Sequence, residues 1–146
     1  LTLYMDIWNN DIVSHALSSK RGDRMTYISG LQDLFSLQSD DMEYKMVLHS
    51  DQGSVYASKD FNKLLPTYIE RSMSRAGTPT DNGAMEAING WIKAELFVDL
   101  HVTQDGDTRQ EIADYIQFFN EQRPAYTLNY MTPRQYKDVH LNNTRA

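Results

Sequence analysis

The hydrophobic and polar positions at the start of the chain follow the pattern of a β-hairpin. Residues 1–9 and residues 11–18 are both rich in β-branched, aromatic and aliphatic side chains, and Asn9 and Asn10 lie at the join between them. Asparagine tolerates the positive φ angles that tight turns require. The pattern therefore predicts two antiparallel strands, with the chain beginning inside the first of them.

The next stretch predicts a helix followed by a buried strand. Apolar residues fall close to helical spacing over residues 23–38, so we expect an amphipathic helix there. A polar loop comes next, and residues 44–48 then form an apolar run that ends at His49. A run of this length between polar residues is typical of a short buried strand.

Two short elements and three longer helices are expected in the rest of the chain. Ser58 suits the N-cap of a short helix that Pro66 ends, and residues 67–73 can form a strand. Asp81 or Thr80 can cap the helix after it. The longer helices are expected at residues 82–97, at residues 108–120 and from Thr132-Pro133 onward, with an irregular segment at 98–107.

Strands and helices that alternate in this way indicate one mixed α/β domain. The chain has 146 residues, of which 40% are hydrophobic, enough for one compact core. It contains no apolar run near the roughly 20 residues that span a bilayer, and no signal-peptide pattern at its start. We therefore expect a soluble protein. Cysteine is absent, which excludes disulfides, thiolate zinc sites and cysteine nucleophiles.

Net charge limits how such a chain could bind nucleic acid. The formal charge is -6 and the pI is about 5.1, whereas bulk attraction to phosphate needs an excess of lysine and arginine. Binding to DNA would have to be local or helped by another domain. Acidic residues gather at Asp40, Asp41 and Glu43 and at Asp105 and Asp107, and basic residues at Lys20, Arg21 and Arg24, at Arg71 and Arg75, and at Arg123, Arg134 and Lys137.

Two carboxylates are the strongest candidates for chemistry. Asp51 follows the buried strand and precedes a glycine, and Glu86 lies one turn into a predicted helix, on the same face as Asn82 and Lys93. Hard divalent cations prefer such oxygen ligands. On the pattern alone, a turn aspartate and a solvated helix glutamate remain the alternative interpretation.

Other candidate chemistry is weaker. His49, Ser50 and Asp51 include all three residue types of a hydrolase triad, but neighbouring side chains on an extended segment point to opposite faces. Helical spacing favours core packing over base stacking for the aromatic residues of the second half. These residues are Tyr115, Phe118, Phe119, Tyr126 and Tyr130.

Three motifs in order resemble the transposases of the insertion sequence 3 family. They are HSDQGSVY, SMSRAGTPTDNGAMEAINGWIKAE and YIQFFNEQRPAYTLNYMTPRQY, and the opening LTLYMDIWNNDIVSHALS is similar too. The resemblance covers nearly all of residues 1–138. It implies an RNase H-like, retroviral integrase-like fold, a mixed sheet flanked by helices, in one domain over residues 1–146 with residues 121–146 as its C-terminal extension.

The family's site consists of three acidic residues, Asp, Asp and Glu, that hold two Mg²⁺ or Mn²⁺ ions. By resemblance, Asp51 is the second acid and Glu86 the third, both catalytic and both metal ligands. Lys93 matches a lysine that contacts the DNA backbone, in a K-x-E pattern completed by Glu95. Arg75 and Asn82 match family positions with expected roles in positioning the loop and helix near DNA. Arg123, in an N-x-x-R pattern that begins at Asn120, is expected to serve in packing or in contacting DNA.

Two departures from the family pattern matter. About 34 residues separate Asp51 from Glu86, where the family usually has 35, and a loop should absorb this difference. The first acid belongs to a strand that would precede Leu1, and Asp6 matches a different family aspartate. We therefore expect an N-terminally truncated core with a gap between the hairpin and the strand before Asp51, so that the sheet rearranges or a second chain fills the gap.

The resemblance implies a DNA transposase core that performs metal-dependent phosphodiester hydrolysis and strand transfer. Expected partners are transposon-end and target DNA and further copies of the chain, with no membrane, in the bacterial cytoplasm and at the nucleoid. Without the first acid the fragment is expected to be inactive or nearly so. The alternatives are a non-catalytic transposase remnant that serves as an interaction module and an RNase H-like nuclease.

Overall fold

A computed structural model describes residues 1–20, 22–36, 45–75, 77–99 and 107–143. Several sequence predictions lie outside these ranges: the acidic cluster at Asp40, Asp41 and Glu43, the start of the strand at Tyr44, and all of the 98–107 segment except its ends.

The chain opens with the predicted β-hairpin. Strand β1 (Thr2–Asp6) pairs antiparallel with β2 (Asp11–Ala16), and an irregularity in register falls between Tyr4 and Met5. Asn10 has a φ of 60°, the left-handed conformation that asparagine tolerates better than most residues. The side-chain pattern at the turn thus predicted both the hairpin and the residue that makes the turn possible.

Helix α1 (Met25–Ser36) packs on the hairpin and begins two residues later than predicted. Its close approach depends on Gly30, because a Cβ there would lie 2.9 Å from Cε2 of Tyr4. The Tyr4 hydroxyl donates to the Tyr27 carbonyl at 2.8 Å, and Ser14 donates to the Gly30 carbonyl at 2.7 Å. One hydrophobic cluster forms around this contact, from Tyr4, Leu31, Leu34 and Phe61.

A parallel strand pair follows. Strand β3 (Met46–Ser50) pairs with β4 (Ile69–Met73), and helix α2 (Lys59–Lys63) lies in the connection between them. The predicted cap is present, because Ser58 Oγ accepts a hydrogen bond from the Phe61 amide at 3.2 Å. Phe61 is the buried residue of this helix, whereas Leu64 after its end is exposed.

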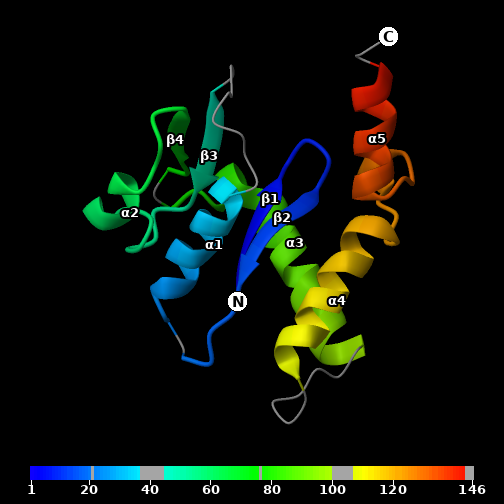
Figure 1. Cartoon of the computed structure of the whole chain (residues 1–146), viewed down its shortest axis with the longest axis horizontal. Coiled ribbons are helices and arrows are strands. Elements are labelled where there is room, and N and C mark those ends of the chain that lie inside the picture. The colour runs from blue at the N-terminus through cyan, green and yellow to red at the C-terminus, as the bar shows by residue number, and fades with distance from the viewer. Residues whose placement is uncertain (21, 37–44, 76, 100–106, 144–146) are drawn as a thin grey trace.

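The strands form two separate sheets within the described residues. One is the antiparallel β1–β2 pair and the other is the parallel β3–β4 pair. In Figure 1 the hairpin lies between the β3–β4 pair and helices α3 and α4. The protein is therefore a mixed α/β structure in which the described part of β1 pairs with β2 alone.

The second half of the chain forms the other hydrophobic cluster. A 3₁₀ turn, η1 (Pro79–Asn82), leads into α3 (Gly83–Ala94), which continues as the π-helical turn η2 (Glu95–Asp99). The start of the segment predicted to be irregular is therefore still helical. Helix α4 (Thr108–Glu121) packs beside α3, and Asp107 caps it by accepting from the Gln110 amide. Buried residues of this cluster include Ile12, Ile88, Ile92, Leu96, Ile112, Tyr115, Ile116 and Phe119.

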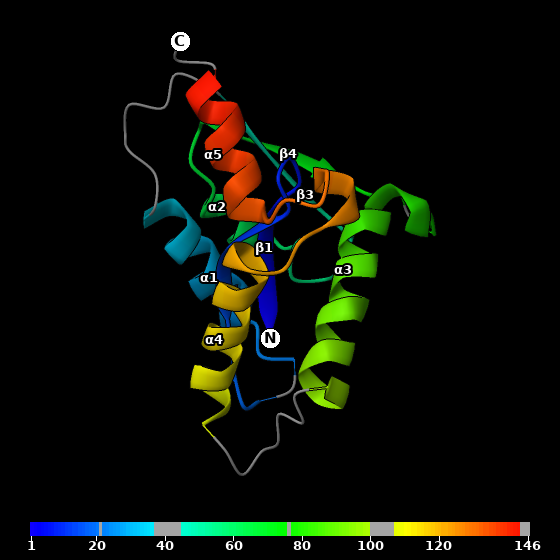
Figure 2. The ribbon, with the colours of Figure 1, turned by 90° about the vertical axis from the view of Figure 1, so that its right-hand side faces the viewer.

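The chain ends in helix α5 (Pro133–Asn143), which a short loop connects to α4 (Figure 2). Thr132 and Gln135 exchange hydrogen bonds between side chain and backbone at 3.1 and 3.2 Å, which forms a capping box with proline at the first helical position, as predicted. Among the described helices, none has the length and apolar character that crossing a bilayer requires.

Candidate functional site

Asp51 lies where the two parallel strands end. Ser50 is in register with Met73, and the Ser74 amide donates to the Ser50 carbonyl at 3.0 Å. The Gln52 side chain donates back to the Ser74 carbonyl at 3.0 Å. Because parallel strands end at one edge of a sheet, these contacts fix the start of the loop after β4 beside Asp51.

The Asp51 side chain is exposed and shapes its own turn. Its Oδ1 accepts a hydrogen bond from the Gly53 amide at 2.7 Å. A Cβ at Gly53 would lie 2.8 Å from this oxygen, so a larger residue there would displace the Asp51 carboxylate. Asp51 thus stabilises a turn, as the alternative to a metal site predicted. Its Oδ2, however, has no hydrogen bond to another described residue and can accept a further ligand.

His49 binds residues of the neighbouring strand rather than a triad partner. Its Nδ1 lies 2.8 Å from Ser72 Oγ and its Nε2 lies 3.1 Å from Ser74 Oγ. Ser50 Oγ instead donates to the Asp51 carbonyl and accepts from Arg71 Nη2 at 2.9 Å. This geometry agrees with the exclusion of a His49-Ser50-Asp51 triad.

An ion pair shapes the loop that leads to Glu86. Asp81 accepts from Nε and Nη2 of Arg75, and from the Arg75 amide, each at 2.9 Å. The Arg75 hydrogen bonds hold the pKa of Asp81 at about 2, well below its ordinary value. Arg75 is 78% exposed in its side chain, so it remains accessible from solvent while it closes the loop.

The start of α3 differs from the prediction. Asn82, rather than Asp81 or Thr80, occupies the N-cap position, and it makes no side-chain cap hydrogen bond. Asn82 was predicted to lie on the same face of this helix as Glu86 and Lys93. Its φ of -128° and ψ of 26° are not those of an α-helix, so Asn82 lies before that face begins. The Asp81 carboxylate is bound to Arg75 instead of capping the helix.

Glu86 and Lys93 lie at opposite ends of α3. Glu86 is in the first turn, where the helix dipole favours a negative charge, and Lys93 is in the last turn, where it favours a positive one. Both side chains are exposed. Within the described residues no group of three Asp, Glu, His or Cys side chains gathers closely enough to hold a metal ion. Asp51 and Glu86 therefore belong to no such group in this part of the chain.

Arg123 is bound within the protein. Its Nη2 lies 2.6 Å from Glu95 Oε1, and its Nε donates to both carboxylate oxygens at 3.0 and 3.1 Å. Tyr115 donates to Glu95 Oε2 at 2.7 Å. Burial raises the pKa of Glu95, but the hydrogen bonds from Arg123 and Tyr115 outweigh it and leave that pKa below the ordinary value. Burial and the Glu95 contact raise the pKa of Tyr115.

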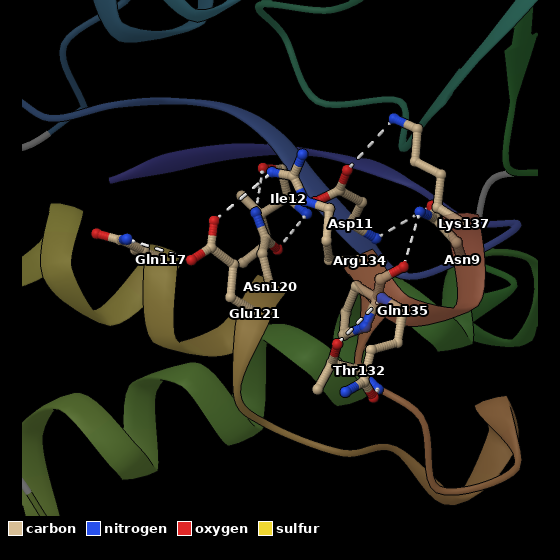
Figure 3. A network of polar contacts seen from close by, with 11 residues as sticks. Asn9, Asp11, Ile12, Gln117, Asn120, Glu121, Thr132, Arg134, Gln135 and Lys137 are labelled. Carbon is tan, nitrogen blue, oxygen red and sulfur yellow. Dashed lines mark hydrogen bonds and ion pairs between the residues drawn. The ribbon is translucent and has the colours of Figure 1, made fainter. Parts of the chain in front are cut away.

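Asn120 joins α4 to the hairpin. Its Oδ1 accepts from the Ile12 amide at 2.9 Å and its Nδ2 donates to the Ile12 carbonyl at 3.0 Å, both buried (Figure 3). The side-chain amide therefore pairs with β2 as a residue of an adjacent strand would. Around it, Asn9 donates to the Pro133 carbonyl at 3.3 Å and Lys137 lies 3.7 Å from Asp11.

The aromatic residues divide into two groups. Tyr115 and Phe119 are buried in the core, as helical spacing predicted, whereas Phe118 is 43% exposed. Tyr126 and Tyr130 are 79% and 71% exposed, so the core interpretation is wrong for them. Tyr126 begins the short 3₁₀ helix η3 (Tyr126–Leu128) and Tyr130 follows it, so both lie after Pro124 and outside α4, which is the sequence signal that separates the two groups.

Comparison with known proteins shows which families this chain resembles. A family model described as integrase core domain matches residues 67–133, which run from β4 to the first residue of α5. The match includes Glu86, Lys93 and Arg123, whereas Asp51 lies outside it.

Relatives extend the match over almost the whole chain. A transposase for insertion sequence element IS904 from Lactococcus lactis is 32% identical over 142 residues, covering 94% of this chain and 54% of the relative. The putative transposase InsK for IS150 from Escherichia coli is 29% identical over 94% of the chain and 48% of the relative. Transposase InsF for IS3fB, also from Escherichia coli, is 22% identical over 97% of the chain and 49% of the relative.

These matches confirm the predicted resemblance. The chain is similar to insertion-sequence transposases, and its residues 67–133 match the integrase core domain model. It spans about half the length of the curated relatives it matches.

Proposed function

We propose that this chain is the catalytic core of a DNA transposase, which hydrolyses a phosphodiester and transfers the freed strand end to another DNA strand. The observation that carries this proposal is the 32% identity to an insertion-sequence transposase over 94% of the chain. We further infer an RNase H-like sheet that a preceding strand would complete, in a single domain over residues 1–146 with residues 121–146 as its C-terminal extension.

Asp51 and Glu86 are the proposed metal ligands, and their chemistry fits Mg²⁺ or Mn²⁺. Both are exposed carboxylates, and Asp51 keeps one oxygen free of hydrogen bonds to described residues. When bound, two such cations would supply positive charge that stabilises phosphate oxygens during cleavage and joining. Two carboxylates make an incomplete site, so we expect this chain alone to be inactive or nearly so.

Four residues are proposed to hold DNA beside the acids. The Lys93 ammonium would contact the phosphate backbone, and Asn82 would direct its amide to the same strand from the start of α3. Arg75 supports this role because its guanidinium is exposed while bound to Asp81. Arg123, bound to Glu95, would act mainly by fixing the end of α4 relative to α3.

The wider setting follows from the same proposal. The partners would be transposon-end and target DNA and further copies of the chain, with the protein acting in the cytoplasm at the nucleoid. The lack of a third acid among the described residues favours one alternative, a non-catalytic transposase remnant that serves as an interaction module. An RNase H-like nuclease is a second alternative, which the transposase relatives make the weaker one.

Manganese binding tests the metal proposal on the chain as it exists. Mn²⁺ should broaden the amide NMR signals of residues around Asp51 and Glu86, because the ion is paramagnetic. Asp51→Asn or Glu86→Gln should abolish this broadening, whereas Glu70→Gln, which changes an exposed acid on β4, should leave it unchanged. If the signals broaden equally in Asp51→Asn and in Glu86→Gln, these two residues are not the metal ligands.

Strand transfer tests the claim of inactivity. The 146-residue chain should not join a labelled transposon end to target DNA in Mg²⁺ or Mn²⁺. Activity that Glu86→Gln abolishes would show that the site is complete within these residues. An aspartate on a strand encoded just before Leu1, whose addition restores activity, would support the truncation.

A further inference from the structure

The structure contains a pocket that the transposase chemistry does not use. It lies between α3, the end of α4 and the loop that leads to α5, and its volume is about 350 Å³. Ile88, Phe119 and Pro133 are buried residues that line it. A pocket of this size is at the lower end of the range found for small ligands.

Two flat aromatic side chains stand exposed at this pocket. Trp91 on α3 is 53% exposed, and Tyr126 on the loop is 79% exposed. In Figure 2 the loop lies beside the start of α3, and Trp91 lies further along this helix. Both residues line the pocket although they come from segments that are far apart in the sequence. Exposed tryptophan and tyrosine rings are characteristic of surfaces that bind a flat partner by stacking.

The loop that presents Tyr126 is held in one conformation. Ala125 and Met131 form an isolated antiparallel bridge, and Asn129 and Tyr130 adopt the left-handed conformation. The Tyr130 ring packs edge-on against Tyr126 at 5.5 Å, and Asn10 from the hairpin turn lies 3.3 Å from Thr127 Oγ1. Because this loop is already ordered, ligand binding would cost little further conformational entropy.

The charge at the pocket is balanced. The Arg123 guanidinium lies 5.7 Å from the Trp91 ring centroid and 5.4 Å from that of Phe119, but Glu95 neutralises it. A neutralised guanidinium is a poor phosphate site, while its remaining N–H groups can still donate to a neutral polar ring. The pocket therefore suits an uncharged, flat, hydrogen-bonding group better than an anion.

We propose that this pocket binds a single unpaired base of DNA, stacked against Trp91 and Tyr126. The inference rests on the proposed transposase function, which brings DNA to α3, although Ile88 and Trp91 lie on another face of this helix than Glu86 and Lys93. Unpaired bases are available wherever strands are nicked or distorted, and every base offers a π-face to an aromatic ring. Arg123 is then a positioning residue, since its guanidinium is held by Glu95 and lies 5.7 Å from the Trp91 ring centroid.

The test compares three labelled DNA probes by fluorescence anisotropy, in EDTA so that no metal contributes. They are a short duplex, the same duplex with one bulged thymidine, and the same bulge with an abasic nucleotide. The bulged thymidine should bind about ten-fold more tightly than the other two, the amount that stacking of one base supplies. Equal affinity for all three probes overturns the proposal.

Matched variants assign the effect to the pocket. Trp91→Ala and Tyr126→Ala should remove the preference for the bulged base, whereas Tyr126→Phe should retain it. Phe118→Ala is the control, because Phe118 is exposed on α4 but does not line the pocket. A preference that survives both alanine variants, or that Phe118→Ala removes equally, contradicts the proposal.

A spectroscopic measurement covers the case in which an alanine variant does not fold. Trp8 and Trp91 are the two tryptophans of the sequence, so Trp8→Phe leaves Trp91 as the sole reporter. The bulged thymidine should quench its fluorescence and the abasic probe should not. Quenching by a proline-rich or aromatic peptide, without quenching by the bulged base, would assign the pocket to a protein partner and overturn the proposal.

The proposed function and this inference can fail separately. Glu86→Gln should leave the base preference intact, because Glu86 is not a pocket residue. Manganese broadening at Asp51 and Glu86 without any base preference removes the inference alone. A base preference without manganese broadening removes the proposed metal site alone.

Discussion

Arg123 and Glu95 form a two-pronged ion pair, with 2.6 Å between Nη2 and Oε1, at the place where the end of α4 meets the end of α3. Each side chain keeps only about a quarter of its surface exposed. An arginine that sequence resemblance associates with DNA thus has a structural partner within the protein.

This ion pair should make stability depend on pH. The folded-state pKa of Glu95 is depressed, so its contribution is present above the ordinary value near 4.5 and is lost as the pH falls through the folded pKa. Arg123→Met should cost about 1–3 kcal/mol near neutral pH and less in acid. Urea denaturation between about pH 6 and about pH 3 measures the free energy of unfolding of the wild type and of the variant. If the wild type and Arg123→Met lost equal stability as the pH falls across that range, the ion pair would not be the source of the pH dependence.

Replacement of Asn120 should destabilise the junction between α4 and the hairpin. Asn120→Leu leaves the Ile12 N–H and C=O groups buried without partners, which should cost about 2–4 kcal/mol. Amide exchange at Ile12 should accelerate with the loss. Gln117→Leu on the exposed face of the same helix is the control and should change stability little. A stable Asn120→Leu variant with slow Ile12 exchange would show that another group satisfies the strand.

Gly30 should be required for α1 to lie on the hairpin. In Gly30→Ala the new Cβ meets Tyr4, whose hydroxyl is fixed on Tyr27, so we expect a loss of about 1–3 kcal/mol despite alanine's higher helix propensity. Gly90→Ala on α3 is the matched control, because no atom lies within 4 Å of the Cβ. It should stabilise the protein by about 0.5–1 kcal/mol. Thermal melting of both variants separates steric from propensity effects.

The Arg75–Asp81 pair can be measured by titration. Carboxyl NMR should give Asp81 a pKa of about 2, and Arg75→Ala should move it up toward the ordinary 3.8. The pair is exposed, so the melting temperature should change little. Arg24→Ala removes an exposed cation elsewhere and should leave the Asp81 pKa unchanged. No upward movement in Arg75→Ala would mean that other groups hold the pKa low.

The division into two sheets bears on oligomeric state. If a strand is missing between β1 and β3, a second chain can occupy the gap, and sedimentation should show a dimer that dissociates on dilution. Amide exchange in β1 and β3 should slow as the dimer forms. A monomer at all concentrations with a single continuous sheet would contradict this hypothesis.

Local signals made much of the fold predictable. Asn10 at the hairpin turn, Ser58 at its cap and Pro133 at the first position of α5 act through neighbouring atoms, so the sequence pattern specified the elements around them. The cap of α3 was predicted wrongly because the Asp81 carboxylate forms an ion pair with Arg75, six residues away, and Asn82 occupies the N-cap position.

The site was less predictable because it depends on distant contacts. Neither the Glu95–Arg123 pair nor the Asn120–Ile12 pair follows from any local pattern, since 28 and 108 residues separate the partners. Asp51 and Glu86 were found through motif resemblance, whereas the Trp91–Tyr126 pocket emerges only when the loop after α4 folds back on α3.

The amide of Asn120 also controls where the hairpin can grow. Exposed strand edges recruit further strands and lead to aggregation, and proteins commonly block them. At Ile12 a side chain from α4 already occupies the outer edge of β2, so an incoming strand cannot pair there. We therefore expect a strand that extends the hairpin to join along β1, whose other edge is unpaired within the described residues.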